Sequence, residues 1–231
     1  MHPARSTSTM HHTLSNHRPA LLLAATLMLA GTGPAQAQSL GDGGTTVKAG
    51  AIRYQTHATT SGITGLGVPA GADAEVNSAT TALLTIERAV SPTLGVELVL
   101  GLPPKITANG SGTVRFLGEV LSARNVAPTV LLNYHFGEPG STLRPYVGLG
   151  INYTHFAEAR TPYGWDVSLS DSWGWAAQVG VDYSLNKQWG LFASVGAAKV
   201  KSDLVAIGAS VLRTTIDFKP ITYAAGLSYR F

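Results

Sequence analysis

Histidines and carboxylates are the residues of this sequence that could carry acid–base or metal chemistry. Beyond residue 37 there are three histidines, His57, His135 and His155, and they lie far apart without an HxH spacing. Glu158 follows His155 by three positions, but the spacing identifies no nucleophile to complete a catalytic set. The chain has no cysteine, which removes thiolate ligands and cysteine nucleophiles. We therefore expect no enzyme, no metal site and no cofactor.

Charged side chains are scarce in this chain. They make up 13% of the 231 residues, against about 25% in ordinary soluble proteins, while hydrophobic residues make up 45% and glycines number 26. The formal net charge is +3, but Arg5 and Arg18 lie in a segment that we expect to be removed, and the other cations are scattered singly. Because no basic stripe is available to neutralise phosphates, the composition argues against nucleic acid as a partner.

The N-terminus has the pattern of a secretion signal. Arg18 precedes an apolar run over 20–30, which is shorter than the roughly 20 residues of a spanning helix but fits a signal-peptide core. An uncleaved anchor helix is the alternative, and Gly31 and Pro34 disfavour it because they would break the helix early. Translation from Met10 would serve equally well and would not change the mature protein.

A cleavage site follows the apolar run. Ala35 and Ala37 supply its two small residues, and Gln38 then begins the mature chain. We predict two regions: a signal peptide over 1–37 and a single domain over 38–231.

Apolar and small residues alternate in the mature chain. In the run RPYVGLGINYTHF (144–156), Val147, Leu149 and Ile151 share one face, whereas glycine and asparagine share the other. The run 172–184 repeats this pattern, with two tryptophans near its start and a tyrosine near its end. An apolar face toward lipid, a small or polar face toward a lumen and aromatic residues at both interfaces are typical of transmembrane β-strands.

Eight alternating runs are present, each near the 9–11 residues that a tilted strand needs to cross the hydrocarbon. They are 45–56, 80–90, 94–102, 126–136, 144–156, 172–184, 189–201 and 211–231. Long links over 57–79, 103–125, 157–171 and 202–210 alternate with short ones over 91–93, 137–143 and 185–188. We predict an all-β fold, an eight-stranded antiparallel transmembrane β-barrel among the lipids of the bacterial outer membrane. A soluble sandwich or lipocalin-like barrel is the alternative, but its loops need not alternate in length.

The inward faces of such a barrel hold the candidate functional residues, because eight strands leave room only for packed side chains or one small ligand. Candidates for a ligand pathway are the apolar residues Leu83, Val99, Leu131 and Phe192. Candidates for charges that pair across the lumen are Lys48, Glu87, Glu97, Asp182 and Arg230. Simple packing of the interior would explain the apolar set at least as well as a pathway does.

Several segments resemble one known family. The runs VAPTVLLNYHF and RPYVGLGINYTHF, the segment SWGWAAQVGVDYSLNKQWGLFASV and the ending GLSYRF are similar to strands of the OmpW family of outer-membrane proteins, and TTVKAGAIRY resembles the start of its mature chain. The resemblance spans nearly the whole mature chain. It implies a narrow, partly hydrophobic barrel that passes or binds small hydrophobic molecules, although the loops, rich in Gly, Ala and Thr, depart from the family.

Two functions are open at this point. The first is a narrow channel or binding pocket for passive uptake of small hydrophobic molecules, which could leave sideways into the bilayer because the bore is tight. The second is a structural or adhesive barrel with a sealed interior and binding loops. The composition of the loops favours flexibility over a rigid surface.

Overall fold

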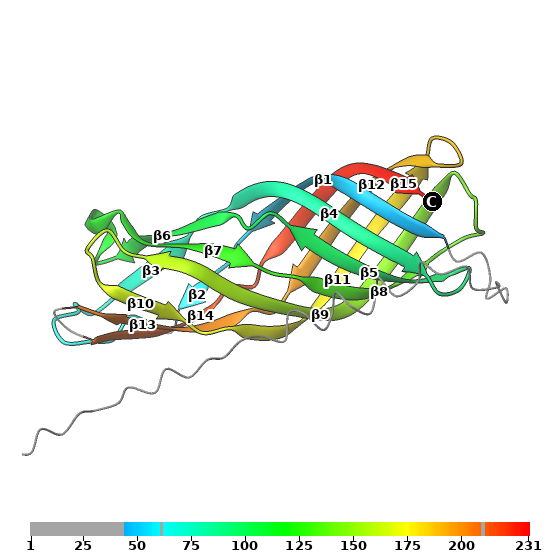
Figure 1. The fold of residues 1–231 in the computed structure, drawn as a ribbon. Coiled ribbons are helices and arrows are strands. Elements are labelled where there is room, and N and C mark those ends of the chain that lie inside the picture. The colour runs from blue at the N-terminus through cyan, green and yellow to red at the C-terminus, as the bar shows by residue number, and fades with distance from the viewer. Residues whose placement is uncertain (1–43, 61, 209–210) are drawn as a thin grey trace, which may run out of the picture. The chain divides into compact units, whose positions relative to one another are not determined.

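The computed structural model describes residues 44–60, 62–208 and 211–231. Within them, eight strands form a closed antiparallel barrel (Figure 1). The ring closes because the first strand pairs with the last, from Thr46↔Arg230 to Gln55↔Ile221. In chain order the barrel strands are β1 (Thr45–Gln55), β4 (Ala79–Ala89), β5 (Leu94–Gly101), β8 (Thr129–His135), β9 (Leu143–Arg160), β11 (Ser172–Ser184), β12 (Trp189–Ala198) and β15 (Ile221–Arg230). The predicted eight-stranded fold is confirmed.

The predicted leader lies outside the described part of the chain. Residues 1–43 are not described, and with them Ala35, Ala37 and Gln38, so the cleavage site stays a prediction. No helix among the described residues is long and apolar enough to cross a bilayer.

Side chains alternate between the two faces of the barrel wall, as the sequence predicts. In β9 the side chain of Tyr146 is 2% exposed, whereas Leu149 is 70% exposed and Ile151 is 57% exposed. Contact of such apolar surface with water costs about 25 cal/mol per Å². The exposed leucines, valines and isoleucines therefore form an outer belt that matches lipid hydrocarbon rather than water.

Aromatic side chains gather at both limits of this belt. At one limit, the rings of Tyr153 and Trp173 lie 4.8 Å apart between centroids. At the other limit, the ring of Tyr229 lies 4.9 Å from that of Trp189 and 4.8 Å from that of Phe231. Amphipathic rings favour the boundary between hydrocarbon and water, so the two girdles mark where the barrel leaves the bilayer.

The two ends of the barrel differ in their connections. At one end, which we name the turn end, residues 90–93, 136–142 and 185–188 join successive strands. At the opposite loop end, the connections contain the short helix η1 (Arg115–Leu117) and seven further strands: β2 (Thr59–Thr60), β3 (Ala72–Val76), β6 (Lys105–Gly112), β7 (Glu119–Val126), β10 (Asp166–Leu169), β13 (Lys201–Ile207) and β14 (Val211–Asp217). The alternation of short and long links is as predicted, and the long links contain strands that the sequence pattern did not predict.

The strands of the loop end prolong the barrel wall. β7 pairs with the far part of β9, and β6 and β3 follow beside it, while β10, β13, β14 and β2 form a separate four-stranded sheet. The predicted strand over 211–231 is thus two strands, because β14 pairs with β13 and only β15 lies in the barrel. The break falls where Lys219 has a φ of 36° and Pro220 has no N–H to continue the ladder.

Arginine at Leu149 tests the assignment of the lipid-facing belt. Leu149 lies midway along the membrane part of β9, so we expect Leu149→Arg to lower the free energy of unfolding by about 2–4 kcal/mol. Val90 is also exposed but lies at the turn end, and Val90→Arg should cost about 1 kcal/mol or less. Reversible unfolding in phospholipid vesicles, followed by tryptophan fluorescence, measures both losses. Equal losses at the two positions would contradict the belt.

Candidate functional site

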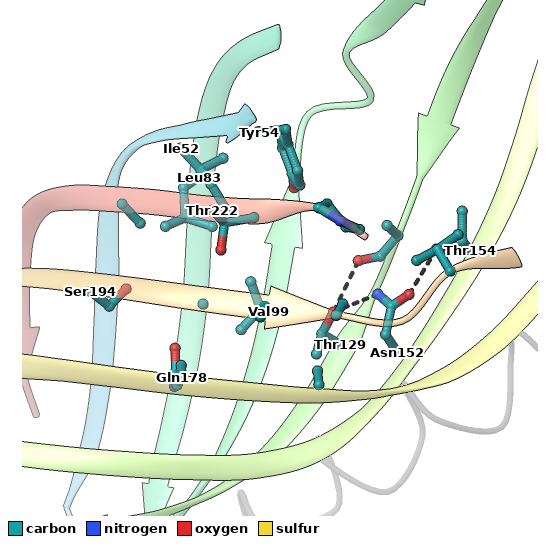
Figure 2. Close-up of a pocket in the computed structure, with 18 of the residues that line it drawn as sticks. Ile52, Tyr54, Leu83, Val99, Thr129, Asn152, Thr154, Gln178, Ser194 and Thr222 are labelled. Carbon is teal, nitrogen blue, oxygen red and sulfur yellow. Dashed lines mark hydrogen bonds between the residues drawn. The ribbon is translucent and has the colours of Figure 1, made fainter. Parts of the chain in front are cut away.

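An apolar cavity of about 110 Å³ lies inside the barrel. The predicted pathway residues Leu83, Val99, Leu131 and Phe192 all line it, each from a different strand. Figure 2 shows Leu83 and Val99 at this space together with Ile52 of β1. An engineered apolar cavity of about 150 Å³ binds benzene, so the space suits a molecule of similar or smaller size. The role of these residues as a pathway stays a prediction.

Three of the predicted lumen charges meet on the turn-end side of the cavity. The Nζ atom of Lys48 lies 3.3 Å from Oε2 of Glu87 and 3.0 Å from Oδ1 of Asp182. Lys48 is 1% exposed and Glu87 is 6% exposed. The ammonium also lies 4.6 Å from the centroid of the Tyr146 ring, which favours a cation over its face. A charge buried in this way is stable only with its partners present.

Glu97, the fourth predicted charge, is held by amides rather than by Lys48. Its Oε2 accepts hydrogen bonds from Nδ2 of Asn133 at 2.8 Å and from Nε2 of Gln178 at 2.6 Å. Gln178 also donates to Oδ1 of Asn133 at 2.9 Å. Glu97 is 2% exposed and Asn133 is fully buried. The alternation of the sequence predicts that Asn133 and Gln178 point inward. It does not predict that they bind Glu97, because that contact depends on the register of the strands.

His135 of β8 lies beside the charged residues Glu87 and Asp182. Its Nε2 lies 2.5 Å from Oε1 of Glu87, and its Nδ1 lies 3.8 Å from Oδ2 of Asp182. One ligand atom from each of these three residues lies within 4.8 Å of the others, a spacing that a metal ion could bridge. Lys48 contacts both carboxylates, however, so its ammonium already supplies the positive charge that a metal would bring. We refer to Lys48, Glu87, His135 and Asp182 as the floor cluster and assign it to closing the bore.

Glycines on neighbouring strands make room for these side chains. A Cβ atom at Gly95 would overlap the carboxylate of Glu87, and one at Gly148 would overlap the side-chain oxygen of Asn133. A third, Gly180, faces the ring of a buried tyrosine in the same way. The small inward residues of the sequence are thus the places where larger side chains cross the bore.

A polar vestibule of about 830 Å³ opens at the turn end. Glu87, His135 and Asp182 line it, and so does Arg230, the fifth predicted lumen charge. The structure therefore places Arg230 in the vestibule and does not bring it into the floor cluster. Because the floor cluster lies between the vestibule and the apolar cavity, the bore is interrupted there.

Apolar side chains close the cavity toward the loop end. The rings of Phe156 in β9 and Phe218, just before β15, stack with their centroids 5.2 Å apart. Val76 and Val200 belong to the same buried cluster. All four residues line the cavity, so they form its roof.

The ladder between β5 and β8 is interrupted beside the cavity. Pairing of the two strands ends at Val99↔Thr129. Beyond it, Pro103 has no N–H to donate, and within the described ranges no backbone hydrogen bond joins Gly101 to Ala127. Pairing resumes where the N–H of Asn125 donates to the carbonyl of Pro104 at 3.1 Å. Val99, Ala127 and Thr129 all line the cavity. We name this gap in the ladder the seam.

His155, near the loop end, pairs with an acid that its local sequence does not indicate. Its Nδ1 lies 2.7 Å from Oδ1 of Asp171, and the hydroxyl of Tyr153 donates to the other oxygen of that carboxylate at 2.6 Å. The hydrogen bond from Tyr153 lowers the pKa of Asp171. Glu158 pairs with Arg124 instead, at 3.2 Å. The His155–Asp171 pair thus ties the connection before β11 to β9.

Known proteins share both sequence and fold with this chain. The OmpW family model matches residues 41–231. Outer membrane protein W of Vibrio cholerae serotype O1 is 36% identical over 165 residues, which are 68% of this chain and 76% of that protein. The dibenzothiophene metabolism operon protein PahQ of Pseudomonas aeruginosa is 35% identical over 120 residues, which are 51% of this chain and 54% of that protein.

The fold is likewise similar to a solved outer-membrane barrel. The crystal structure of the outer membrane protein OprG from Pseudomonas aeruginosa matches with a TM-score of 0.76 and 28% sequence identity, covering 82% of this chain and 96% of that one. The resemblance noted in the sequence is therefore confirmed, and so is the predicted location in the outer membrane. With its eight-stranded barrel and a family match that spans all of the described residues, the chain belongs to the OmpW family.

Proposed function

We propose that this barrel takes up small hydrophobic molecules passively, through the apolar cavity and out through the seam into the bilayer. The cavity carries the proposal, because Leu83, Leu131 and Phe192 offer an apolar binding surface inside a barrel too narrow for a water-filled pore. A sealed adhesive barrel would need no such space. The name of the relative PahQ refers to the metabolism of dibenzothiophene, a hydrophobic compound, which supports the same class of cargo.

The floor cluster determines the route. Long connections of bacterial barrels face the outside and short turns face the periplasm, which puts the loop end outside and the vestibule on the periplasmic side. An apolar molecule moving straight through would have to displace Lys48, Glu87 and Asp182 from one another, and separated charges in a dry bore are very costly. The seam offers a route that leaves these charges paired.

The proposed mechanism includes no covalent step and no cofactor. A molecule enters from the loop end past the Phe156–Phe218 roof, gains apolar contact in the cavity and partitions into lipid beside β5. Leu102, which is 66% exposed and lies at the end of β5, presents an apolar surface at that exit.

A matched pair of tryptophan variants tests uptake through the cavity. Leu131 faces the cavity and Leu132, the next residue of β8, faces lipid. We expect Leu131→Trp to slow the entry of radiolabelled benzene into intact cells by about tenfold, because the indole fills the binding space, and Leu132→Trp to leave the rate within about twofold of wild type. Heat-dependent gel mobility shows whether both variants fold. Equal entry rates in the two folded variants would refute uptake through this cavity.

Narrowing the seam tests the sideways exit separately from binding. Ala127 lines the cavity at the seam, whereas Ala82 lies on the outer face of β4. We expect Ala127→Trp to slow benzene entry by about fivefold while equilibrium binding to the purified barrel changes by less than about twofold, because release is hindered and the deeper walls are intact. Ala82→Trp is the control and should change neither quantity. Unchanged entry with Ala127→Trp would point to an exit elsewhere.

A further inference from the structure

Polar side chains line the cavity at two levels. Toward the loop end, Thr129, Asn152 and Thr154 line it and are joined by hydrogen bonds. Next to the floor cluster, Thr85, Glu97 and Gln178 line it. Figure 2 shows Gln178 and Ser194 on neighbouring strands across the space from Leu83. A molecule next to the floor cluster would therefore meet these hydrogen-bonding groups beside the apolar side chains of Leu83 and Phe192.

Thr85 has an unused hydrogen-bonding group. The residue is 3% exposed, and its Oγ1 is buried without a hydrogen-bond partner among the described residues. Oδ1 of Asn125, a residue that lines the cavity near the seam, is likewise buried without a hydrogen-bond partner among the described residues. Buried polar atoms of native proteins normally have a partner, so each exception calls for a physical explanation. Oγ1 of Thr85 has almost no accessible surface, so a polar group on the cargo would satisfy Thr85 once rotation about χ1 turns the hydroxyl toward the cavity.

Glu97 makes the cavity wall next to the floor cluster negatively charged. Lys48 forms ion pairs with Glu87 and Asp182, whereas Glu97 is held by two neutral amides. Both of those hydrogen bonds reach Oε2, which leaves Oε1 as an acceptor for a cargo. Because Glu97 is buried, in surroundings of lower dielectric than water, a second anion near it would be repelled strongly, while a donor or a cation would be attracted.

We propose that the cavity selects amphiphiles with a short apolar tail and a hydrogen-bond-donating head, an alcohol or a primary ammonium, over carboxylates. The inference rests on the proposed uptake function and specifies its cargo. The tail contacts Leu83, Leu131 and Phe192, and the head lies between Thr85 and Glu97. A plain alkane would fill the apolar part but would leave the hydroxyl of Thr85 unpaired.

Probes that share one tail test the selection. The full mature barrel is placed in phosphatidylcholine nanodiscs with ¹³C-labelled leucine and valine methyl groups, and hexylammonium, 1-hexanol and hexanoate are titrated at neutral pH. Saturable shifts of the methyl signals of Leu83, Val99 and Leu131 report occupancy, after partition into protein-free nanodiscs is subtracted. We expect hexylammonium and 1-hexanol to bind about tenfold or more tightly than hexanoate.

Two variants separate the contributions of the head-group partners. Glu97→Gln should abolish most of the discrimination against hexanoate, and Thr85→Val should weaken 1-hexanol by about threefold to tenfold. Thr80→Val, on the exposed face of the same strand, is the matched control and should change nothing. Wild-type methyl spectra of the free variants establish that each is folded.

Three results would overturn the inference. Equal affinity for the three probes, or tighter binding of hexanoate, would refute the selection and leave uptake of hydrophobic molecules standing. Unaltered discrimination in both Glu97→Gln and Thr85→Val would refute the assigned head-group site. Absence of any saturable shift with all three probes would refute both the inference and the proposed function.

Discussion

The pairing of β1 with β15 is the interaction on which the other features depend. In hydrocarbon each unpaired backbone N–H or C=O costs several kcal/mol, so a sheet can cross the bilayer only when its last strand returns to its first. Closure with eight strands fixes a bore barely wider than the side chains that enter it. Every second residue of each strand then points inward, and the contents of the bore are decided by which of these residues meet.

Closure of the barrel determines which side chains point inward, but it does not determine whether those side chains are polar or apolar. Two very different environments therefore occupy one barrel: an apolar cavity next to Leu83 and Phe192, and a floor in which Lys48 lies between Glu87 and Asp182. Removing one member of a buried group of charges typically costs about 3–5 kcal/mol, because the others lose their compensation. Under the proposed function, the floor is thus a barrier to cargo, and exchange would fall to the side wall, where the ladder between β5 and β8 is interrupted.

The alternation of the sequence predicted the membrane strands closely, as in 172–184, which is β11 without a change of boundary. It failed at the loop end. The strands in 57–79 pair with partners distant in sequence, whereas β6 and β7 in 103–125 pair with each other, and strands outside the bilayer need no apolar face. The inward position of the lumen charges was predictable from the same alternation. Their partners were not, since the choice between Lys48 and an amide for Glu97 depends on register and on where each side chain crosses the bore.

Glycines of the barrel wall influence the width of the cavity indirectly. Gly148 faces the side chains of Asn133 and Gln178, which in turn hold Glu97 at the edge of the cavity. A methyl group at Gly148 would have to displace these side chains, one of which, Gln178, lines the cavity. The width of the cavity is therefore set partly by Gly148, a residue that does not line it. Under the proposed function, a substitution at Gly148 would change the space open to a cargo without altering a residue that the cargo contacts.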